Sequence, residues 1–434
     1  MSDISDLRPP MPQQRWVRLI PVAFIMYTIA YIDRTNISLA LPYLSRDLHM
    51  DPAQAGDAAG IFFWGYIALQ IPGGYLASHW SAKRFVAILL VAWGLCAVGC
   101  GFVQTRREFW VMRLLLGVAE SGVWPATLVL LSHWFPRAER ARANAFWMAC
   151  LPVAVICSSP ISGWILGHWN WRVLLTTEGV LPFVWLVIWL WQVNDHPRHA
   201  SWISPEEREY LETALGGERE EFSGAGHEPY LRVLLRPQVL VMVGVYFLLN
   251  TSNYGYLFWL PTALEHTKKI SDLTAGYLYA VPYLLTGIAM VLNARHSDRQ
   301  RERRWHVVLP LACTGTLILA GALQIGHAPT FALALLFLAG AGAYSAHGPF
   351  WAIPTETLPP RVAGAAMGLV NAIGNLGGYL GPLTVGFFFK RTGGFALGFG
   401  ALSLSMLGSA SLALLLGRRK VTTRSATSYT LTAC

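Results

Sequence analysis

The chain has 434 residues, of which 54% are hydrophobic and only 13% are charged. Soluble chains carry about 25% charged residues, so this deficit argues against a set of soluble domains. The net charge of +9 could suggest a nucleic-acid partner, but the uneven placement of Lys and Arg along the chain offers another explanation. The six cysteines have no spacing typical of a metal site, and we expect neither a metal nor a cofactor.

Apolar stretches close to the length of about 20 residues that crosses a bilayer recur along the whole chain. Strands of a membrane barrel would alternate with a period of two, which these stretches do not. We therefore expect an all-α membrane protein with twelve transmembrane helices. The predicted spans are residues 16–41, 53–77, 85–105, 109–132, 143–166, 173–193, 239–261, 274–293, 306–325, 330–353, 363–388 and 396–416.

Lys and Arg are distributed unevenly between alternate loops. If the N-terminus lies inside, most of the 33 Lys and Arg residues fall on that same side. This positive-inside pattern predicts that both termini are cytoplasmic, and it accounts for the net charge without nucleic acid. The external loop at about residues 42–52 is short, and a glycosylation triplet at Asn250 lies within a span. Both features favour a bacterial inner membrane.

The first span contains the sequence Tyr-Ile-Asp-Arg-Thr-Asn at residues 31–36. Ionisable side chains within a bilayer are costly and usually functional. Asp33 and Asn36 are three residues apart and share one helical face, whereas Arg34 points about 100° away from Asp33. Arg34 should therefore reach a different neighbour or a ligand. An ion pair that only packs helices together is the alternative for Asp33.

The fourth span places Arg113, Gly117, Glu120 and Trp124 on one face, at spacings of four, three and four residues. Glu120 lies about 10.5 Å along the helix axis from Arg113. The face thus combines a cation that can bind a carboxylate with a carboxyl group that can change its protonation. Arg113 lies one turn inside the outer boundary, so an arginine that extends to the membrane surface is the alternative.

Polar and aromatic side chains in four other spans could line a cavity. In three pairs of these residues, a spacing of four places both side chains on one helical face, and Asn250 and Tyr254 belong to a stretch of amides and hydroxyls in the seventh span. Polar contacts between helices and a packed histidine are the alternatives. The residues are Tyr66 with Gln70, Asn250 with Tyr254, His347 with Trp351, and Asn371 with Asn375.

A polar segment after the sixth span divides the chain into similar halves. Residues 74–84 align with residues 294–304 at an offset of 220 residues, and residues 135–137 echo residues 359–361 at an offset of 224. Such repeats predict two parallel six-helix bundles with a site between them near the middle of the membrane. The predicted units are an N-terminal bundle at 1–193, a cytoplasmic linker at 194–236, a C-terminal bundle at 237–417 and a cytoplasmic tail at 418–434.

The two repeated loops resemble the signature loop of the major facilitator superfamily. Asp298, Arg299 and Arg303 keep its acidic and basic positions in the second copy, and Lys83 and Arg84 keep basic positions in the first. The resemblance implies a gating role for these residues on the cytoplasmic face. Ser78 stands where the first copy would have its acid, and this departure bears on how firmly that gate closes.

Four stretches resemble the anion:cation symporter family, the bacterial relatives of vesicular glutamate and sialic acid carriers. They are residues 33–36, 63–74, 113–120 and 371–378. The resemblance implies a major facilitator fold, proton coupling through Asp33 and Glu120, and binding of the substrate carboxylate by Arg34 and Arg113. The neutral candidates are then expected to bind substrate too, with Asn36 among them.

The expected function is proton-coupled symport of a small organic anion by alternating access. The seventh span carries no basic residue, which disfavours a dicarboxylate of the glutamate type and suits a sugar acid or hydroxycarboxylate. A drug or metabolite exporter on the same fold and a non-transporting ligand sensor are the alternatives. We find no nucleotide-binding or hydrolase motif and expect no enzyme activity. The expected partners are the anion, protons and the lipid bilayer, with no nucleic acid, and the expected state is a monomer.

Overall fold

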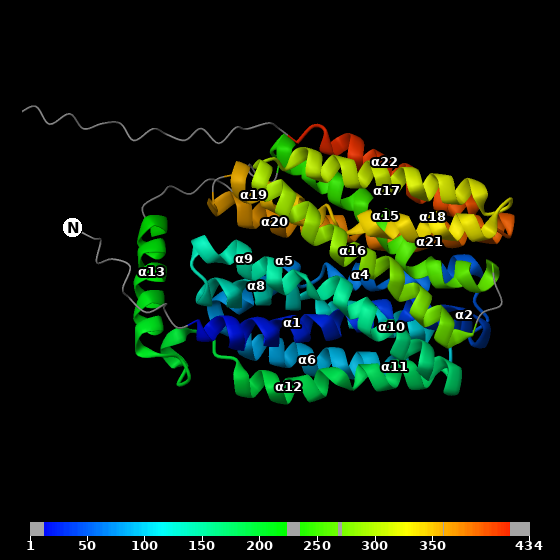
Figure 1. Cartoon of the computed structure of the whole chain (residues 1–434). Coiled ribbons are helices and arrows are strands. Elements are labelled where there is room, and N and C mark those ends of the chain that lie inside the picture. Colours follow the sequence, from blue (N-terminus) through cyan, green and yellow to red (C-terminus); the bar gives the residue numbers. More distant parts are fainter. Residues whose placement is uncertain (1–12, 224–234, 268–270, 359, 417–434) are drawn as a thin grey trace, which may run out of the picture.

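The computed structural model describes residues 13–223, 235–267, 271–358 and 360–416, and the regular structure within these ranges is helical (Figure 1). The predicted tail at 418–434 lies outside them, as does part of the predicted linker. The helices of the first half are α1 Gln14–Thr35, α2 Ile37–Asp47, α3 Pro52–Gly60, α4 Phe62–Tyr66, α5 Gln70–Leu76, η2 Ala77–Ser81, α6 Ala82–Cys100, α7 Arg106–Ser121, α8 Val123–Trp134, α9 Arg137–Met148, α10 Cys150–His168, α11 Trp171–Gly179 and α12 Leu181–Gln192.

The linker contributes η3 and α13, and the second half follows from α15. These elements are η3 Pro197–His199, α13 Pro205–Ser223, α15 Pro237–Thr267, α16 Asp272–Gln300, α17 Arg304–Gln324, α18 Pro329–Ala343, α19 His347–Thr357, α20 Pro360–Asn375, α21 Gly377–Thr392 and α22 Ala396–Ala413.

The helical membrane fold expected from the sequence is confirmed. Within the described residues, nine stretches are long and apolar enough to cross a membrane, and they include ten of the predicted spans. The other two predicted spans, 239–261 and 363–388, lie on α15 and on α20 with α21. The count of twelve crossings stays a prediction.

The first span is interrupted at Asn36, between α1 and α2, and hydroxyl side chains explain the interruption. Thr35 Oγ1 donates to the carbonyl of Tyr31 at 2.8 Å, and Ser38 Oγ donates to the carbonyl of Thr35 at 2.7 Å. Such bonds compete with the helical ladder and bend helices. The backbone at Asn36 stays helical, with φ −57° and ψ −31°, so the chain continues in nearly the same direction. The charged residues of this span therefore lie at a local irregularity in mid-span.

The two halves pack against each other mainly through three pairs of helices, which are α10 with α16, α3 with α21, and α2 with α15. Close approaches occur at Gly386 of α21, where an added Cβ would lie 2.2 Å from the carbonyl oxygen of Pro52, and at Gly276 of α16, where it would lie 2.4 Å from that of Ser159 in α10. Only a glycine allows the two backbones to come this near.

The contacts between the halves are concentrated at the end of the molecule away from α13, which we call the far end (Figure 1). There Lys390 Nζ of α21 pairs with Asp51 at 2.9 Å, and the Tyr43 hydroxyl donates to Asp272 of α16. The opposite end, where α13 lies, is called the linker end. The far end is closed in this structure.

The linker helix α13 lies across the linker end and is attached to the first half (Figure 1). The side chain of Ser204 caps the start of this helix, because Ser204 Oγ accepts a hydrogen bond from the backbone N–H of Glu207 at 3.2 Å. The carboxylate of Glu207, which is completely buried, pairs with Arg15 of α1, and Arg15 also pairs with Glu139 of α9. One ionic contact therefore holds α13 to α1, and the other joins α1 to α9.

Candidate functional site

The two halves enclose a central cavity of about 20 Å³ near the middle of the helices. A volume of this size holds about one water molecule. An organic ligand therefore requires the halves to separate around this point. The lining residues are Tyr27, Tyr31, Arg34, Tyr66, Trp124, Met148, Leu151, Tyr246, Asn250, Tyr254, Tyr344, His347, Asn371 and Asn375.

Helical spacing explains why these side chains converge. On α1, Tyr27, Tyr31 and Arg34 follow each other at spacings of four and three residues, so that they share one face. The same rule places Tyr246, Asn250 and Tyr254 on one face of α15. The two faces meet at the cavity, one from each half of the chain.

Arg34 supplies the positive charge of the central cavity, and its guanidinium already interacts with other side chains of the protein. Arg34 Nη2 donates to Glu120 Oε2 at 3.1 Å, and both residues are at most 3% exposed. The guanidinium carbon lies 4.4 Å from the centre of the Tyr66 ring, and Tyr254 lines the same cavity. The second carboxylate oxygen of Glu120 has no hydrogen-bond partner. The cation is therefore shared between a carboxylate and aromatic faces.

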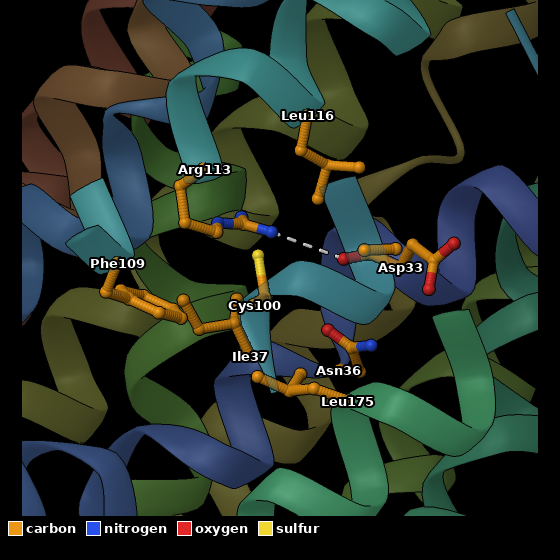
Figure 2. Close-up of a pocket in the computed structure, with 9 residues that line it drawn as sticks. Asp33, Asn36, Ile37, Cys100, Phe109, Arg113, Leu116 and Leu175 are labelled. Carbon is orange, nitrogen blue, oxygen red and sulfur yellow. Dashed lines mark hydrogen bonds between the residues drawn. The ribbon is translucent and has the colours of Figure 1, made fainter. Parts of the chain in front are cut away.

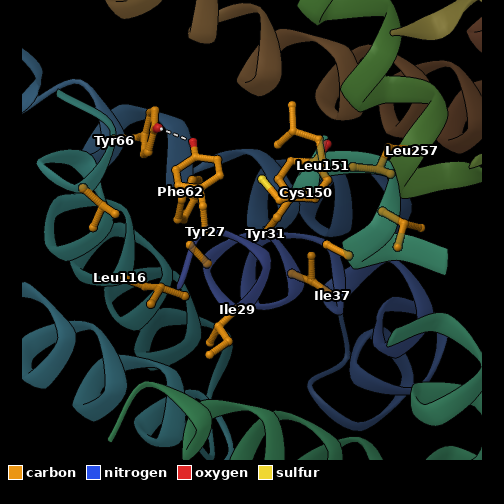
Figure 3. Close-up of a cluster of buried hydrophobic side chains, with 14 of the residues drawn as sticks. Tyr27, Ile29, Tyr31, Ile37, Phe62, Tyr66, Leu116, Cys150, Leu151 and Leu257 are labelled. Atoms are coloured by element: carbon orange, nitrogen blue, oxygen red, sulfur yellow. Dashed lines mark hydrogen bonds between the residues drawn. The ribbon is translucent and has the colours of Figure 1, made fainter. Parts of the chain in front are cut away.

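The aromatic ring of Phe62 separates Arg34 from Arg113. Each guanidinium carbon lies 5.1 Å from the centre of this ring, and Phe62 is completely buried. Figure 3 shows Phe62 beside Tyr66, Tyr27 and Tyr31 in the packed interior. The two arginines are thus placed on separate sides of one side chain.

Arg113 lies at a second, smaller cavity of about 10 Å³ inside the first half (Figure 2). Its Nη1 donates to the backbone carbonyl of Asp33 at 3.3 Å, and its Nε and Nη2 have no hydrogen-bond partner. The Asp33 carboxylate points away from Arg113 and accepts the indole N–H of Trp93 at 2.6 Å. Asn36 lines this inner cavity as well. The inner cavity therefore gathers a buried cation and a buried acid away from the central one.

The expected common face of the fourth span is divided by packing. Gly117 approaches α4 so closely that an added Cβ would lie 2.0 Å from the carbonyl oxygen of Phe62. Arg113 consequently reaches the inner cavity, Glu120 reaches Arg34, and Trp124, beyond the interruption at Gly122, reaches the central cavity. Arg113 is only 2% exposed, so it lies in the interior and does not extend to the surface.

The neutral candidates divide in a similar way. Asn371 Nδ2 donates to Gln70 Oε1 at 3.0 Å, which joins α20 to α5 across the two halves at the edge of the cavity. Asn375 bonds to Asn371 at 3.0 Å. Trp351 lies outside the lining and packs edge-on against Tyr246, with ring centres 5.0 Å apart.

Five lining aromatic residues were missed in the sequence, although the spacing of some of them could have revealed them. Tyr27 and Tyr31 precede Arg34 by seven and three residues, and Tyr344 precedes His347 by three. The Tyr31 and Tyr344 hydroxyls meet at 2.6 Å across the two halves. The Tyr27 and Tyr66 hydroxyls lie 3.3 Å apart (Figure 3). The missed residues are Tyr27, Tyr31, Trp124, Tyr246 and Tyr344.

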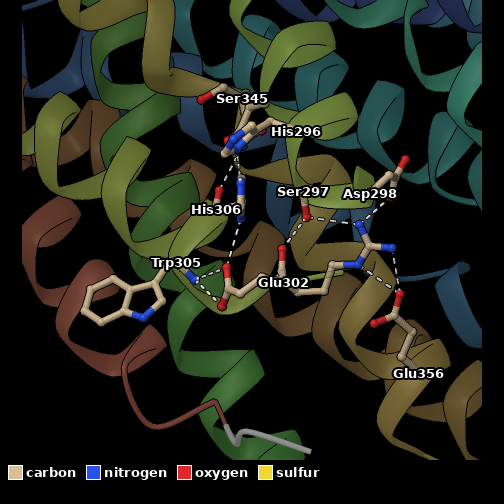
Figure 4. Close-up of polar contacts among 10 residues, drawn as sticks. His296, Ser297, Asp298, Glu302, Trp305, His306, Ser345 and Glu356 are labelled. Carbon is tan, nitrogen blue, oxygen red and sulfur yellow. Dashed lines mark hydrogen bonds and ion pairs between the residues drawn. The ribbon is translucent and has the colours of Figure 1, made fainter. Parts of the chain in front are cut away.

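The second signature loop forms an ionic cluster at the linker end (Figure 4). Arg303 pairs with Asp298 and, at 2.8 Å, with Glu356 of α19, whereas Arg299 is exposed. Burial would lower the pKa of Arg303, but the hydrogen bonds that its guanidinium donates to Glu356 and Asp298 outweigh it and raise that pKa. The loop thus ties α16, α17 and α19 together.

In the first signature loop, an acid from outside the motif compensates for Ser78. The carboxylate of Asp195, just after α12, accepts hydrogen bonds from Ser81 Oγ at 2.6 Å and from the backbone N–H of Lys83 at 2.9 Å. Arg84 is exposed. The start of α6 therefore receives a carboxylate even though the loop itself lacks one.

Comparisons with known proteins agree with this architecture. The Major Facilitator Superfamily matches residues 23–382. A putative tartrate transporter of Agrobacterium vitis is 33% identical, over 98% of this chain and 96% of its own. A quinolone resistance transporter of Acinetobacter baumannii is 31% identical, over 90% and 91% of the two chains. The solved inward open conformation of the xylose transporter XylE from E. coli has the same fold, with a TM-score of 0.74 and 14% identity over 94% and 98%. The chain therefore belongs to the major facilitator superfamily and is an integral, multi-pass membrane transporter, not an enzyme.

Proposed function

We propose that this transporter is a proton-coupled symporter of a small hydroxylated organic anion. The observation that carries the proposal is the buried pair of Arg34 and Glu120 at the wall of the central cavity. A substrate carboxylate and Glu120 compete for the same guanidinium. Protonation of Glu120 ends that competition and frees Arg34 to bind the anion.

The charge balance of the site supports coupling to one proton. Arg34 and Arg113 carry two positive charges, and ionised Asp33 and Glu120 balance them. A bound anion would add one uncompensated negative charge, which costs several kcal/mol in a buried site. One proton taken up by Asp33 or Glu120 removes this excess, so that anion and proton are bound together.

The rest of the lining suits hydroxyl groups. Tyrosine hydroxyls and the amides of Asn250, Asn371 and Asn375 surround Arg34, and each can both donate and accept hydrogen bonds. A hydroxycarboxylate or sugar acid would place its carboxylate at Arg34 and its hydroxyls against this ring. The relative from Agrobacterium vitis is described as a putative tartrate transporter, and tartrate is such a compound.

Arg113 and Asp33 have a supporting role in this proposal. They line the inner cavity behind Phe62, where a substrate in the central cavity would not touch them. Their charges still act on Glu120 and Arg34 through a dry interior, in which electrostatic interactions reach further than in water. We propose that Arg113 and Asp33 set the charge of the Arg34–Glu120 pair. Arg34 alone binds the carboxylate of the substrate directly.

The contacts between the halves support alternating access. The far end is closed by the Asp51–Lys390 pair and by close backbone contacts, and the central cavity has room for about one water. A transport cycle would open each end in turn around Arg34. From the charge distribution in the loops, we infer that the linker end and both termini face the cytoplasm. We further propose that the membrane is a bacterial inner membrane and that the chain acts as a monomer.

A drug exporter is the second candidate, because one relative is described as a quinolone resistance transporter. Quinolones also carry a carboxylate, so a buried arginine does not by itself exclude them. The tyrosine and asparagine lining favours the smaller hydroxylated anion. Competition between tartrate-like acids and quinolones for the purified protein separates the two candidates.

The proposal is tested by uptake into proteoliposomes under an imposed pH gradient. A panel of radiolabelled hydroxycarboxylates and sugar acids is offered to the wild type and to the double variant Asp33→Asn with Glu120→Gln. The wild type should accumulate an acid against its gradient, and the double variant should only exchange it. Unchanged accumulation by the double variant would contradict the proton-coupling assignment. The exposed Glu209→Gln change on α13 is the matched control.

A further inference from the structure

Glu178, in the last turn of α11, is a buried acid that the proposed cycle does not yet use. It is 5% exposed, and no Lys, Arg or His among the described residues pairs with it. Its Oε1 lies 2.7 Å from Ser162 Oγ of α10, and its Oε2 has no hydrogen-bond partner. A buried carboxylate without a cation costs several kcal/mol, so its environment favours the neutral acid.

The number of hydrogen atoms available at Ser162 also indicates that Glu178 is protonated. Ser162 Oγ lies 2.9 Å from the carbonyl oxygen of Ser158 and 2.7 Å from Glu178 Oε1. A hydroxyl group has one hydrogen to donate, and a carbonyl oxygen can only accept. If Ser162 donates to Ser158, the contact with Glu178 needs a hydrogen from the carboxyl group. A protonated Glu178 satisfies both contacts.

Ser162 belongs to the turn of α10 that contacts the second half. On one side of it, the carbonyl of Ser159 lies 2.4 Å from where a Cβ of Gly276 would be. On the other side, a Cβ added to Gly163 would lie 2.6 Å from the carbonyl oxygen of Asp272. The bond between Glu178 and Ser162 therefore supports a turn of α10 whose backbone closely contacts α16 of the second half.

We propose that Glu178 is a third proton-binding residue that links protonation of the first half to closure of the far end. It is a positioning residue, because it acts through Ser162 and α10 and not on the substrate. When α10 and α16 are in contact, Glu178 is protonated and bonded to Ser162. When they separate and water reaches α11, Glu178 releases its proton and the turn of α10 loses its support. This inference deepens the proposed function and rests on it for its place in a transport cycle.

Other charged groups lie on the helices around α11, and the experiment must separate them from Glu178. Asp33 repels an ionised Glu178, and the nearby amide of Asn36 stabilises the ionised form. The elements packed around α11 contribute Asp33 of α1, Cys100 of α6 and Arg113 of α7, and the outer ends of α2 and α11 contribute the Asp47–Arg172 pair.

The experiment measures the width of the far end at several pH values without substrate. Spin labels replace Trp169, after α10, and Leu397, in α22, which are both exposed, in a chain whose native cysteines have been substituted. Pulsed electron resonance then gives the distance between the halves. The background carries Asp33→Asn and Glu120→Gln, so that Glu178 is the only one of the three proposed proton-binding acids that can still titrate.

We expect the fraction of molecules with a long far-end distance to rise severalfold between pH 6 and pH 9 in this background. The further change Glu178→Gln, which keeps the residue neutral, should abolish the rise and leave the distance short. Ser162→Ala should also abolish it, because the link to α10 is removed, whereas the Glu209→Gln control should not. An unchanged response in the Glu178→Gln variant, or no response in the background, would overturn the proposal.

Infrared spectroscopy gives a second, direct measurement. The background variant should show the carbonyl band of one protonated buried carboxylic acid at neutral pH, and Glu178→Gln should remove that band. Absence of the band would show that Glu178 is ionised and would refute the inference. Neither measurement uses a substrate, so a failure to find organic-anion transport leaves both results standing and is recognised separately.

Discussion

Replacement of Glu120 by Gln should tighten substrate binding at high pH, although it removes a residue of the site. In the wild type, the substrate carboxylate must displace Glu120 from Arg34, with which it pairs at 3.1 Å. Two unit charges about 4 Å apart attract by about 4 kcal/mol at an effective dielectric constant of about 20. A neutral glutamine keeps a hydrogen bond worth about 1 kcal/mol. The difference of about 3 kcal/mol corresponds to roughly 100-fold tighter binding.

The effect should depend on pH with a definite sign. At low pH Glu120 of the wild type is protonated, Arg34 is free, and the wild type and the variant should bind equally well. As the pH rises and Glu120 ionises, the wild type should lose affinity while Glu120→Gln keeps it. The free variant should also be less stable by about 3–5 kcal/mol, because Arg34 is left buried without its partner.

Calorimetric titration of the purified protein with the transported acid, across a pH series, measures this difference. Glu209→Gln should follow the wild type at every pH, since this side chain is exposed on α13. Weaker binding by Glu120→Gln with the same pH dependence as the wild type would refute the competition between substrate and Glu120.

Four further predictions concern Arg34, its neighbours Arg113 and Phe62, and the Asp51–Lys390 pair at the far end. Arg34→Lys removes a bidentate donor and should weaken binding by about 10- to 100-fold, measured by calorimetry. Arg113→Lys should change affinity less than about threefold but lower the number of protons moved per substrate, measured by flux in proteoliposomes; a large loss of affinity would show direct contact. Phe62→Leu removes the ring between the arginines, with cation–π contacts of about 0.5–2 kcal/mol each, and should make uptake less dependent on the pH gradient. Burial raises the pKa of Asp51, but hydrogen bonds from Lys390 and backbone amides outweigh it and lower that pKa. The far-end pair is therefore fully formed above the ordinary Asp pKa of about 3.9 and is lost only as the pH falls through the lowered value. Asp51→Asn should increase far-end opening equally at all pH values between about 5 and 8, measured by the same spin labels.

Local periodicity predicted much of the site. The sequence placed Asp33 and Arg34 on different faces of the first span, and the structure puts them at two different cavities. Spacing of four residues also paired Asn371 with Asn375, and both line the central cavity, as do Asn250 and Tyr254 from the polar stretch of the seventh span. These predictions succeed because a helix fixes which side chains share a face.

Tertiary packing decided what periodicity could not. Arg113 and Glu120 share a face of α7, but α4 approaches that face at Gly117 and inserts Phe62 between the two arginines. No pattern within the fourth span records this contact. Glu178 was missed for a similar reason, because its partner Ser162 lies on another helix and its significance depends on the contact of α10 with α16.

The central claim is tested most directly by measuring proton and substrate fluxes together in one preparation of proteoliposomes. A pH-sensitive dye inside the vesicles reports protons while a labelled hydroxy acid reports substrate. The account predicts that wild-type protein moves protons together with the acid in a fixed ratio, and that Glu120→Gln still exchanges the acid but no longer couples it to protons in that ratio. Uptake of the acid without proton movement in the wild type, or an unchanged ratio in Glu120→Gln, would contradict it.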